Sequence, residues 1–422
     1  MSNSIKLVTN MTLFLVVFLL VSNIPYYILS LRIGLVPWHF WFGCIVICVF
    51  LSIFNKGFIS ISRPALTYLM WNFCFLLMGC LSLFFIFDGG SMEQFIQYTW
   101  MSALGATFIV LAKDRSNFNA SGYGMVVAVV LLAVLSVMEF LDPNFQVIVD
   151  RFFEDASKVG EVNRSGALYE NSNDNGHVMV LGMFIGQFFL PVRLRLLFSI
   201  LVGVAVFCTV SRASLTVWGL AVLISLLFGY SAKSSVFVKM FGMCFVVLLA
   251  FLLISGQIPA LLVQFDLDQY MSTNMLERLS QNFFTQSDGS TEVRKDLVVL
   301  SLEAFSNNPL VGTGLGSSEG MIGDIGTHNQ FLKIAVEQGI LGLLVYLALF
   351  PVALFRKSIA AMVFVFLYFL FALSSHTMMS YPAYAIMIPM SVAILPVLLQ
   401  VKQKKRRRRR RRSATGRAES MV

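Results

Sequence analysis

One histidine stands where its imidazole could act as a general base. His328 follows a long polar segment and precedes an apolar helix expected over 329–350. A helix N-terminus carries partial positive charge, which disfavours the protonated imidazolium. A neutral imidazole is the form that proton abstraction requires. A structural role is the alternative, and it is our interpretation of His39, His177 and His376, which lie near span ends or inside a span.

Arg212 is a candidate for binding an anion. Residues 194–230 carry no other charge except Arg195, and their length indicates either one over-long helix or two short spans. A tight hairpin near Ser211 and Arg212 fits the second case. An arginine at membrane depth is costly and usually marks a function or a partner. Snorkelling of the side chain to the outer interface is the alternative.

Arg294 lies in the first turn of a predicted amphipathic helix over 292–307. A cation there opposes the helix dipole, so its position suggests that it faces an anion. A solvated surface charge is the alternative. The apolar positions that predict the helix are Leu297, Leu300, Ala304 and Phe305.

Two further stretches suggest substrate contacts. The glycine-rich sequence GTGLGSS over 312–318, with Gly314 and Gly316, could offer backbone N–H groups to an anion, although an ordinary turn is the alternative. Arg164 and the polar run YENSNDN over 169–175 could bind an anion and sugar hydroxyls. Asn and Asp are also common loop and cap residues.

The sequence gives little support for a metal site. Asp266 and Asp268 form one D-x-D pair, with no histidine or second acidic cluster close by. All six cysteines lie in apolar runs, so neither a disulfide framework nor zinc spacing is indicated. We therefore expect no metal and no cofactor.

Membrane helices must position these residues. Of 422 residues, 57% are hydrophobic and 13% charged, and the mean hydropathy is +0.79. Soluble domains are about 45–50% apolar and about 25% charged. We therefore expect an all-α polytopic membrane protein with about twelve transmembrane helices. The predicted spans are 11–30, 34–54, 65–87, 95–112, 122–141, 174–190, 195–211, 213–229, 236–255, 329–350, 358–376 and 382–400.

The charge distribution predicts which side each loop faces. With the N-terminus placed in the cytoplasm, the inner segments hold most of the 31 lysines and arginines. Of the 22 acidic residues, those segments hold only Asp114 and Glu419. This asymmetry follows the positive-inside rule.

The predicted layout is one transmembrane domain over 1–400 with two long outer loops. The smaller loop spans 142–173, and the larger spans 256–328 between the ninth and tenth spans. The basic tail over 401–422 is expected to be disordered and cytoplasmic, where it can rest on anionic lipid headgroups. In a bacterium the outer loops face the periplasm, which lacks nucleotide sugars. A titratable group there favours catalysis on a lipid-linked substrate that carries its own activation.

The order Arg212, Arg294, glycine-rich turn, His-Asn and Glu-x-Gly is more specific than any single piece, and a further run follows Arg164 nearer the N-terminus. TVSRASLTV surrounds Arg212, NNPLVGTGLGSS ends the helix of Arg294, THNQFLKIAVEQGILG contains His328, and RSGALYENSN begins at Arg164. Together they resemble the O-antigen ligase/polymerase superfamily of bacterial envelope glycosyltransferases. The resemblance is most specific over residues 195–350.

The resemblance implies a metal-independent, inverting transfer at the periplasmic face of the inner membrane. A glycan on undecaprenyl diphosphate moves to a sugar hydroxyl. The acceptor is lipid A–core in ligases, or another lipid-linked repeat in polymerases. The implied partners are these lipid-linked substrates and membrane lipids, with no nucleic acid.

The resemblance also implies residue roles. Arg212 and Arg294 would clamp the diphosphate, because guanidinium groups pair with phosphate oxygens through two hydrogen bonds. His328 would activate or orient the acceptor hydroxyl. Glu337 lies about 13 Å deeper on the helix, so a supporting role in bracing the bundle is favoured. The candidates for substrate binding are Arg164, Asn173, Gly314, Gly316 and Asn329.

Two questions stay open at this point. Two arginine-bearing outer loops suit a polymerase, whereas one dominant loop ending at the histidine suits a ligase, which we favour. The alternative of another class is a lipid-glycan transporter (flippase), although the halves show no internal repeat. A structural membrane subunit is a third alternative.

Overall fold

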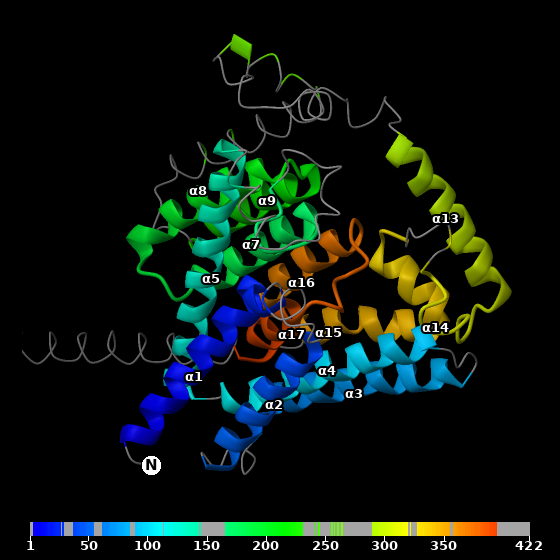
Figure 1. The fold of residues 1–422 in the computed structure, drawn as a ribbon, viewed down its shortest axis with the longest axis horizontal. Helices are drawn as coiled ribbons and strands as arrows, with labels where there is room; N and C mark the ends of the chain where they lie inside the picture. The colour runs from blue at the N-terminus through cyan, green and yellow to red at the C-terminus, as the bar shows by residue number, and fades with distance from the viewer. Residues whose placement is uncertain are drawn as a thin grey trace, which may run out of the picture.

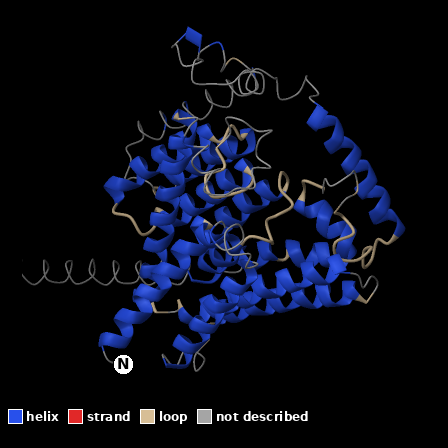
Figure 2. Ribbon diagram, in the orientation of Figure 1, coloured by secondary structure: helices blue, strands red, loops and turns tan. Residues whose placement is uncertain are grey.

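The computed structural model of this chain is helical throughout the elements that it describes (Figure 2). It describes residues 3–26, 28, 37–54, 61–84, 89–112, 114–142, 145, 165–230, 289–319, 321, 327–354 and 358–394, with isolated positions between 240 and 264. The predicted span 236–255, most of the larger loop and the tail 401–422 fall outside the described residues.

A described helix lies at each of the remaining predicted spans. The described helices are α1 (Asn3–Ser22), α2 (Pro37–Phe54), α3 (Arg63–Leu83), α4 (Gly89–Leu111), α5 (Arg115–Leu141), α7 (Ser172–Gly186), α8 (Val192–Cys208), α9 (Arg212–Leu227), α13 (Gly289–Asn307), α14 (Gln330–Leu347), α15 (Leu349–Leu354), α16 (Ile359–Ala372) and α17 (Pro382–Pro389), which continues into the π-helix η5 (Met390–Ile394). The all-α expectation is confirmed for these residues.

Among the residues that the structure describes, four helical segments are long and apolar enough to cross a membrane: Ser4–Ser22, Ala65–Leu83, Arg115–Leu141 and Gln330–Leu354. The apolar helices of 10–17 residues in the same part of the chain are His39–Ile53, Arg212–Leu227, Ile359–Ala372 and Pro382–Val392. The number of twelve spans and the sides on which the loops lie therefore stay predictions.

The helices form two groups joined through the centre of the molecule (Figure 1). In one group, α5 contacts α1, α7 and α8, and α7 contacts α9. In the other, α4 contacts α2 and α3, and α14 contacts α3 and α13. Helix α17 contacts α1 and α7 in the first group and α4 in the second. Helix α16 contacts α7 and α9 in the first group, and it reaches the second through α15, which contacts α14 and α3.

From Leu7 onward the exposed side chains of α1 are apolar, as most of its buried ones are. Leu13 and Val17 are fully buried, whereas Leu7, Met11 and Leu15 are more than half exposed. A helix on the surface of a soluble protein would carry polar residues on that face. The pattern therefore indicates contact with lipid.

A short turn separates α8 from α9 at the position that the sequence predicted. Helix α8 ends at Cys208, and α9 begins at Arg212 after the cap residue Ser211. Val210, within the turn, has a φ of 52°. The expectation of two short helices joined by a tight hairpin is confirmed.

Candidate functional site

His328 lies two residues before α14, in a backbone conformation that is uncommon for a side-chain-bearing residue. Its φ is 48°, in the left-handed region. The next residue, Asn329, caps the helix, because its Oδ1 accepts the N–H groups of Phe331 at 2.9 Å and Leu332 at 3.2 Å. The cap fixes the backbone from which the half-buried His328 side chain extends.

Helix α14 is interrupted at Gly339, which has a φ of 65° and a ψ of −165°. The turn after α13 lies against the interruption. The N–H of Ile340 donates to the carbonyl of Pro309 at 2.8 Å, and that of Leu341 donates to the carbonyl of Leu310 at 3.3 Å. N–H groups freed by a helix break need partners where water is excluded. The turn supplies them, so the NNPLVG and EQG sequences act as one structural unit.

The glycine-rich turn also pairs with the part of α14 before the interruption. The N–H of Gly314 donates to the carbonyl of Glu337 at 3.1 Å. A Cβ on Gly312 would lie 2.4 Å from the carbonyl carbon of Glu337. Part of the predicted anion nest therefore binds α14 instead. Gly316, with a φ of 79°, lies against the first turn of α4.

The carboxylate of Glu337 is fully buried and joins three elements. Its Oε1 accepts the hydroxyl of Ser318 at 2.6 Å, and its Oε2 accepts the side-chain amide of Gln94 at 2.9 Å. Ser82 donates to its backbone carbonyl at 2.7 Å. The residue thus ties α14 to the glycine-rich turn, α4 and α3, and in this structure it braces the bundle.

A buried cation, Lys333, lies on α14 between His328 and Glu337. Its side chain is 3% exposed, and its Nζ lies 2.8 Å from the Oε1 of Glu319, whose side chain is 62% exposed. Burial of an ammonium group is costly unless it is paired. Glu319 therefore provides the pairing at the end of the glycine-rich turn.

The ring of His328 packs against a second histidine. The ring centroids of His328 and His376 lie 5.3 Å apart, with an interplanar angle of 76°. His376 belongs to the loop between α16 and α17. Burial lowers the pKa of its imidazole to about 4, and the charge of the nearby Lys333 acts in the same direction. His376 is therefore neutral at pH 7.

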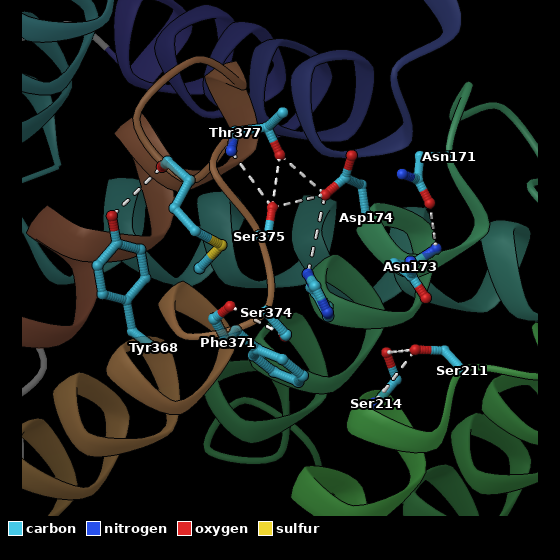
Figure 3. Close-up of polar contacts among 12 residues, drawn as sticks. Asn171, Asn173, Asp174, Ser211, Ser214, Tyr368, Phe371, Ser374, Ser375 and Thr377 are labelled. Atoms are coloured by element: carbon cyan, nitrogen blue, oxygen red, sulfur yellow. Dashed lines mark hydrogen bonds and ion pairs between the residues drawn. The ribbon is translucent and has the colours of Figure 1, made fainter. Parts of the chain in front are cut away.

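Asp174, in the first turn of α7, holds this loop in place (Figure 3). Its Oδ1 accepts the hydroxyl of Thr377 at 2.9 Å and that of Ser375 at 3.2 Å. The Nδ1 of His177 lies 3.8 Å from the same oxygen. The two hydroxyl donors flank His376 in sequence, so both of its neighbours are fixed to α7.

The N-terminal halves of α7 and α9 pack closely against each other. A Cβ on Gly176 would lie 2.4 Å from the hydroxyl oxygen of Ser214. Ser211, the cap of α9, accepts the N–H of Ser214 at 3.3 Å and its hydroxyl at 2.9 Å. Arg212, half-buried, is the first residue of α9.

A continuous set of contacts therefore joins the N-termini of α7, α9 and α14. The loop of His376 links α14 to α7, and Gly176 links α7 to α9. Each helix N-terminus carries partial positive charge. Such an arrangement favours an anionic ligand, as phosphate groups are commonly bound at helix N-termini.

The structure describes the predicted residues Arg294 and Arg164 only in part or not at all. Arg294 lies in α13, but its side chain is outside the described part, as is the whole of Arg164. The segment after Arg164 is fixed by Glu139, which accepts the hydroxyl of Ser165 at 2.7 Å and the N–H of Ala167 at 2.8 Å.

Asn173 is half-buried in the first turn of α7, and its N–H donates to the side chain of the cap Asn171 at 2.8 Å. Its own amide group therefore extends from the helix end that carries Asp174. The structure thus places Asn173, Arg212 and His328 at the starts of α7, α9 and α14, the three helices that Gly176 and the His376 loop connect.

Sequence reasoning gave no role to Glu139 or Lys333, which are isolated charged residues in apolar sequence and therefore a weak signal. Asp174 was included only as part of the polar run over 169–175, as a possible sugar contact. His376 was interpreted as an interfacial or bundle histidine. Its contact with His328 depends on how residues that are far apart in the chain pack, which no local pattern reports.

Residues 197–347 match the sequence model of a protein family described as O-antigen ligase. This range contains Arg212, Arg294 and His328, and the match confirms the predicted resemblance to the O-antigen ligase/polymerase superfamily. No curated protein matches the chain. Together with the apolar helices, the match supports a bacterial membrane protein with ligase- or polymerase-type activity.

Proposed function

We propose that this chain, whose residues 197–347 match the O-antigen ligase family, transfers a glycan from undecaprenyl diphosphate to a sugar hydroxyl of lipid A–core. The transfer takes place at the periplasmic face of the bacterial inner membrane. One observation carries the proposal. His328 belongs to a contact network that includes three helix N-termini, and Arg212 opens one of those helices.

The acceptor half of the site is built around His328. Its imidazole accepts the proton of the acceptor hydroxyl as the hydroxyl oxygen attacks the anomeric carbon of the donor glycan. The bond between that carbon and the diphosphate oxygen breaks from the opposite side, so the anomeric configuration inverts. The left-handed backbone of His328 and the cap of Asn329 hold the ring at a fixed place for this step.

The donor half of the site has to stabilise a leaving diphosphate. Arg212 and Arg294 pair with its oxygens and offset the negative charge that grows as the glycosidic bond breaks. The positive ends of α7, α9 and α14 act in the same direction. Because fixed cations and dipoles supply this stabilisation, the proposed reaction requires no metal ion and no nucleotide.

Glu337 and the glycine-rich turn have a different task in this proposal. The carboxylate of Glu337 is occupied by Ser318 and Gln94, inside the bundle. These contacts keep the interrupted α14 in one shape, so that the helix end at His328 keeps its position. Glu337 is therefore a positioning residue, whereas Arg164, Asn173 and Gly316 stay candidates for contact with the glycan.

The proposal is tested by transfer assays on purified Arg212→Ala, Arg294→Ala and His328→Ala variants. Each variant should lose about 10²-fold or more of its activity, as expected when a general base or a charge-stabilising group is removed. Arg193→Ala is the matched control, because Arg193 is exposed at the start of α8. Near-normal transfer by all three site variants would refute the proposal.

The same assay separates the two activities of the superfamily. Glycan attached to lipid A–core indicates a ligase. Longer lipid-linked chains, with lipid A–core unchanged, would instead indicate a polymerase that joins lipid-linked repeats.

A further inference from the structure

The loop between α16 and α17 contributes to the site but lies outside the matched range of residues 197–347. It carries His376, and it reaches His328 on one side and Asp174 on the other. Neither the motifs nor the family match gives this loop a role.

The position of His376 suggests contact with a ligand. Its ring meets that of His328 edge to face, at 5.3 Å between centroids. Its Nδ1 is buried and has no hydrogen-bond partner among the residues that the structure describes. A buried polar atom left unsatisfied costs about 1–3 kcal/mol, so such atoms are usually bound in the functional state.

The loop between α16 and α17 is fixed to α7 by hydrogen bonds to a buried carboxylate. Asp174 is 2% exposed, and the hydroxyls of Ser375 and Thr377 both donate to its Oδ1. The two hydroxyls also lie 2.8 Å from each other. Because these residues stand on either side of His376, the network fixes the backbone from which the imidazole extends.

We propose that the Nδ1 of His376 binds a hydroxyl of the acceptor sugar, next to the hydroxyl that His328 deprotonates. Asp174 is a positioning residue that acts through Ser375 and Thr377. No proton leaves the acceptor through His376, which orients the sugar so that its nucleophilic oxygen faces His328. This inference rests on the proposed function and deepens it, because it names the residue that selects and orients the acceptor.

Two substitutions separate hydrogen bonding from packing. His376→Asn keeps a polar amide atom near the place of Nδ1 but removes the ring, whereas His376→Phe keeps a ring against His328 but removes the hydrogen bond. We expect His376→Phe to raise the KM for the acceptor about 3–10-fold, which corresponds to one hydrogen bond. We expect His376→Asn to stay close to wild type, and the KM for the donor to stay unchanged in both.

A role in packing alone predicts the opposite order, with the phenylalanine variant active and the asparagine variant impaired. That result would overturn the inference, as would equal acceptor KM values in all three proteins. His39→Ala is the matched control, since His39 is exposed on α2.

The role of Asp174 is tested by a double-mutant cycle. Asp174→Ala removes the acceptor of both hydroxyls, whereas Asp174→Asn keeps an amide oxygen that can accept them. If Asp174 acts through His376, the Asp174→Ala/His376→Phe double variant should be no worse for the acceptor than His376→Phe alone. Additive losses would show that Asp174 serves only the fold.

Failure of the inference is distinguishable from failure of the proposed function by measuring acceptor binding and transfer together. A wild-type protein that neither binds lipid A–core nor transfers glycan would overturn both. A wild-type protein that does both, with an equally competent His376→Phe variant, would overturn only the role of His376.

Discussion

Replacement of Gly339 by alanine should separate the turn after α13 from the interrupted α14. An alanine at a φ of 65° and a ψ of −165° costs about 1–3 kcal/mol in backbone strain. Its Cβ would also lie 2.4 Å from the carbonyl carbon and oxygen of Leu310. These are backbone atoms, so relief requires the turn to move away.

Movement of the turn would break the hydrogen bonds that Ile340 and Leu341 donate to it. Each contributes about 0.5–1.5 kcal/mol, which brings the expected total loss to about 2–6 kcal/mol. With an unfolding entropy of about 2.1 cal/mol/K per residue, the Tm of this 422-residue chain should fall by about 2–7 °C.

The assay is thermal unfolding in detergent micelles, followed by helical circular dichroism. Gly43→Ala is the matched control, because a Cβ at Gly43 meets no atom within 4 Å and alanine favours a helix interior. Its Tm should equal or slightly exceed that of wild type. A Gly339→Ala variant that melts with wild type would refute the account of the interruption.

Three further predictions concern the site and its support. Glu337→Ala should destabilise the protein by about 3 kcal/mol or more, because buried donors lose their acceptor, whereas Glu337→Gln should reduce the stability much less. Urea unfolding compares the two variants, and equal losses of stability would contradict the bracing role of Glu337. Asn329→Ala should cost about 1 kcal/mol of stability through loss of the cap, and it should also reduce the rate of transfer, since His328 is adjacent. An unchanged transfer rate would contradict the positioning of His328 by the cap. His376 has a pKa of 6.5 when unfolded and about 4 when folded, so the unfolded state binds the proton first and stability should fall as the pH drops from 6.5 to 4. Melting curves across that pH range should show a smaller decline in Tm for His376→Phe than for wild type. Equal declines in Tm would contradict the burial of a neutral His376.

The sequence predicted the helices well because their signals are local. Apolar runs and polar caps locate a helix without reference to the rest of the chain, and the hairpin before Arg212 followed from one charge in a long apolar stretch. The interruption of α14 was not predicted, since EQG reads as an ordinary helical sequence. Only contact with the distant turn at Pro309 makes the left-handed Gly339 favourable.

The sequence motifs indicated the candidate site residues but not the residues that hold them in place. His328, Arg212 and the glycine-rich turn stand out because of charge, spacing or composition. Asp174 and the loop of His376 come from segments some 200 residues apart, and Asp174 reaches that loop only because α16 and α7 pack together. Sequence patterns report the residues of one segment, whereas such contacts are set by the tertiary fold.

The most direct test of the proposed function is a transfer assay with purified protein, undecaprenyl-diphosphate glycan and lipid A–core, with EDTA present and no nucleotide. We predict that glycan appears on lipid A–core with inverted anomeric configuration, and that His328→Ala abolishes it. Absence of any transfer by well-folded wild-type protein with matched substrates would contradict the proposal and favour a lipid-glycan transporter.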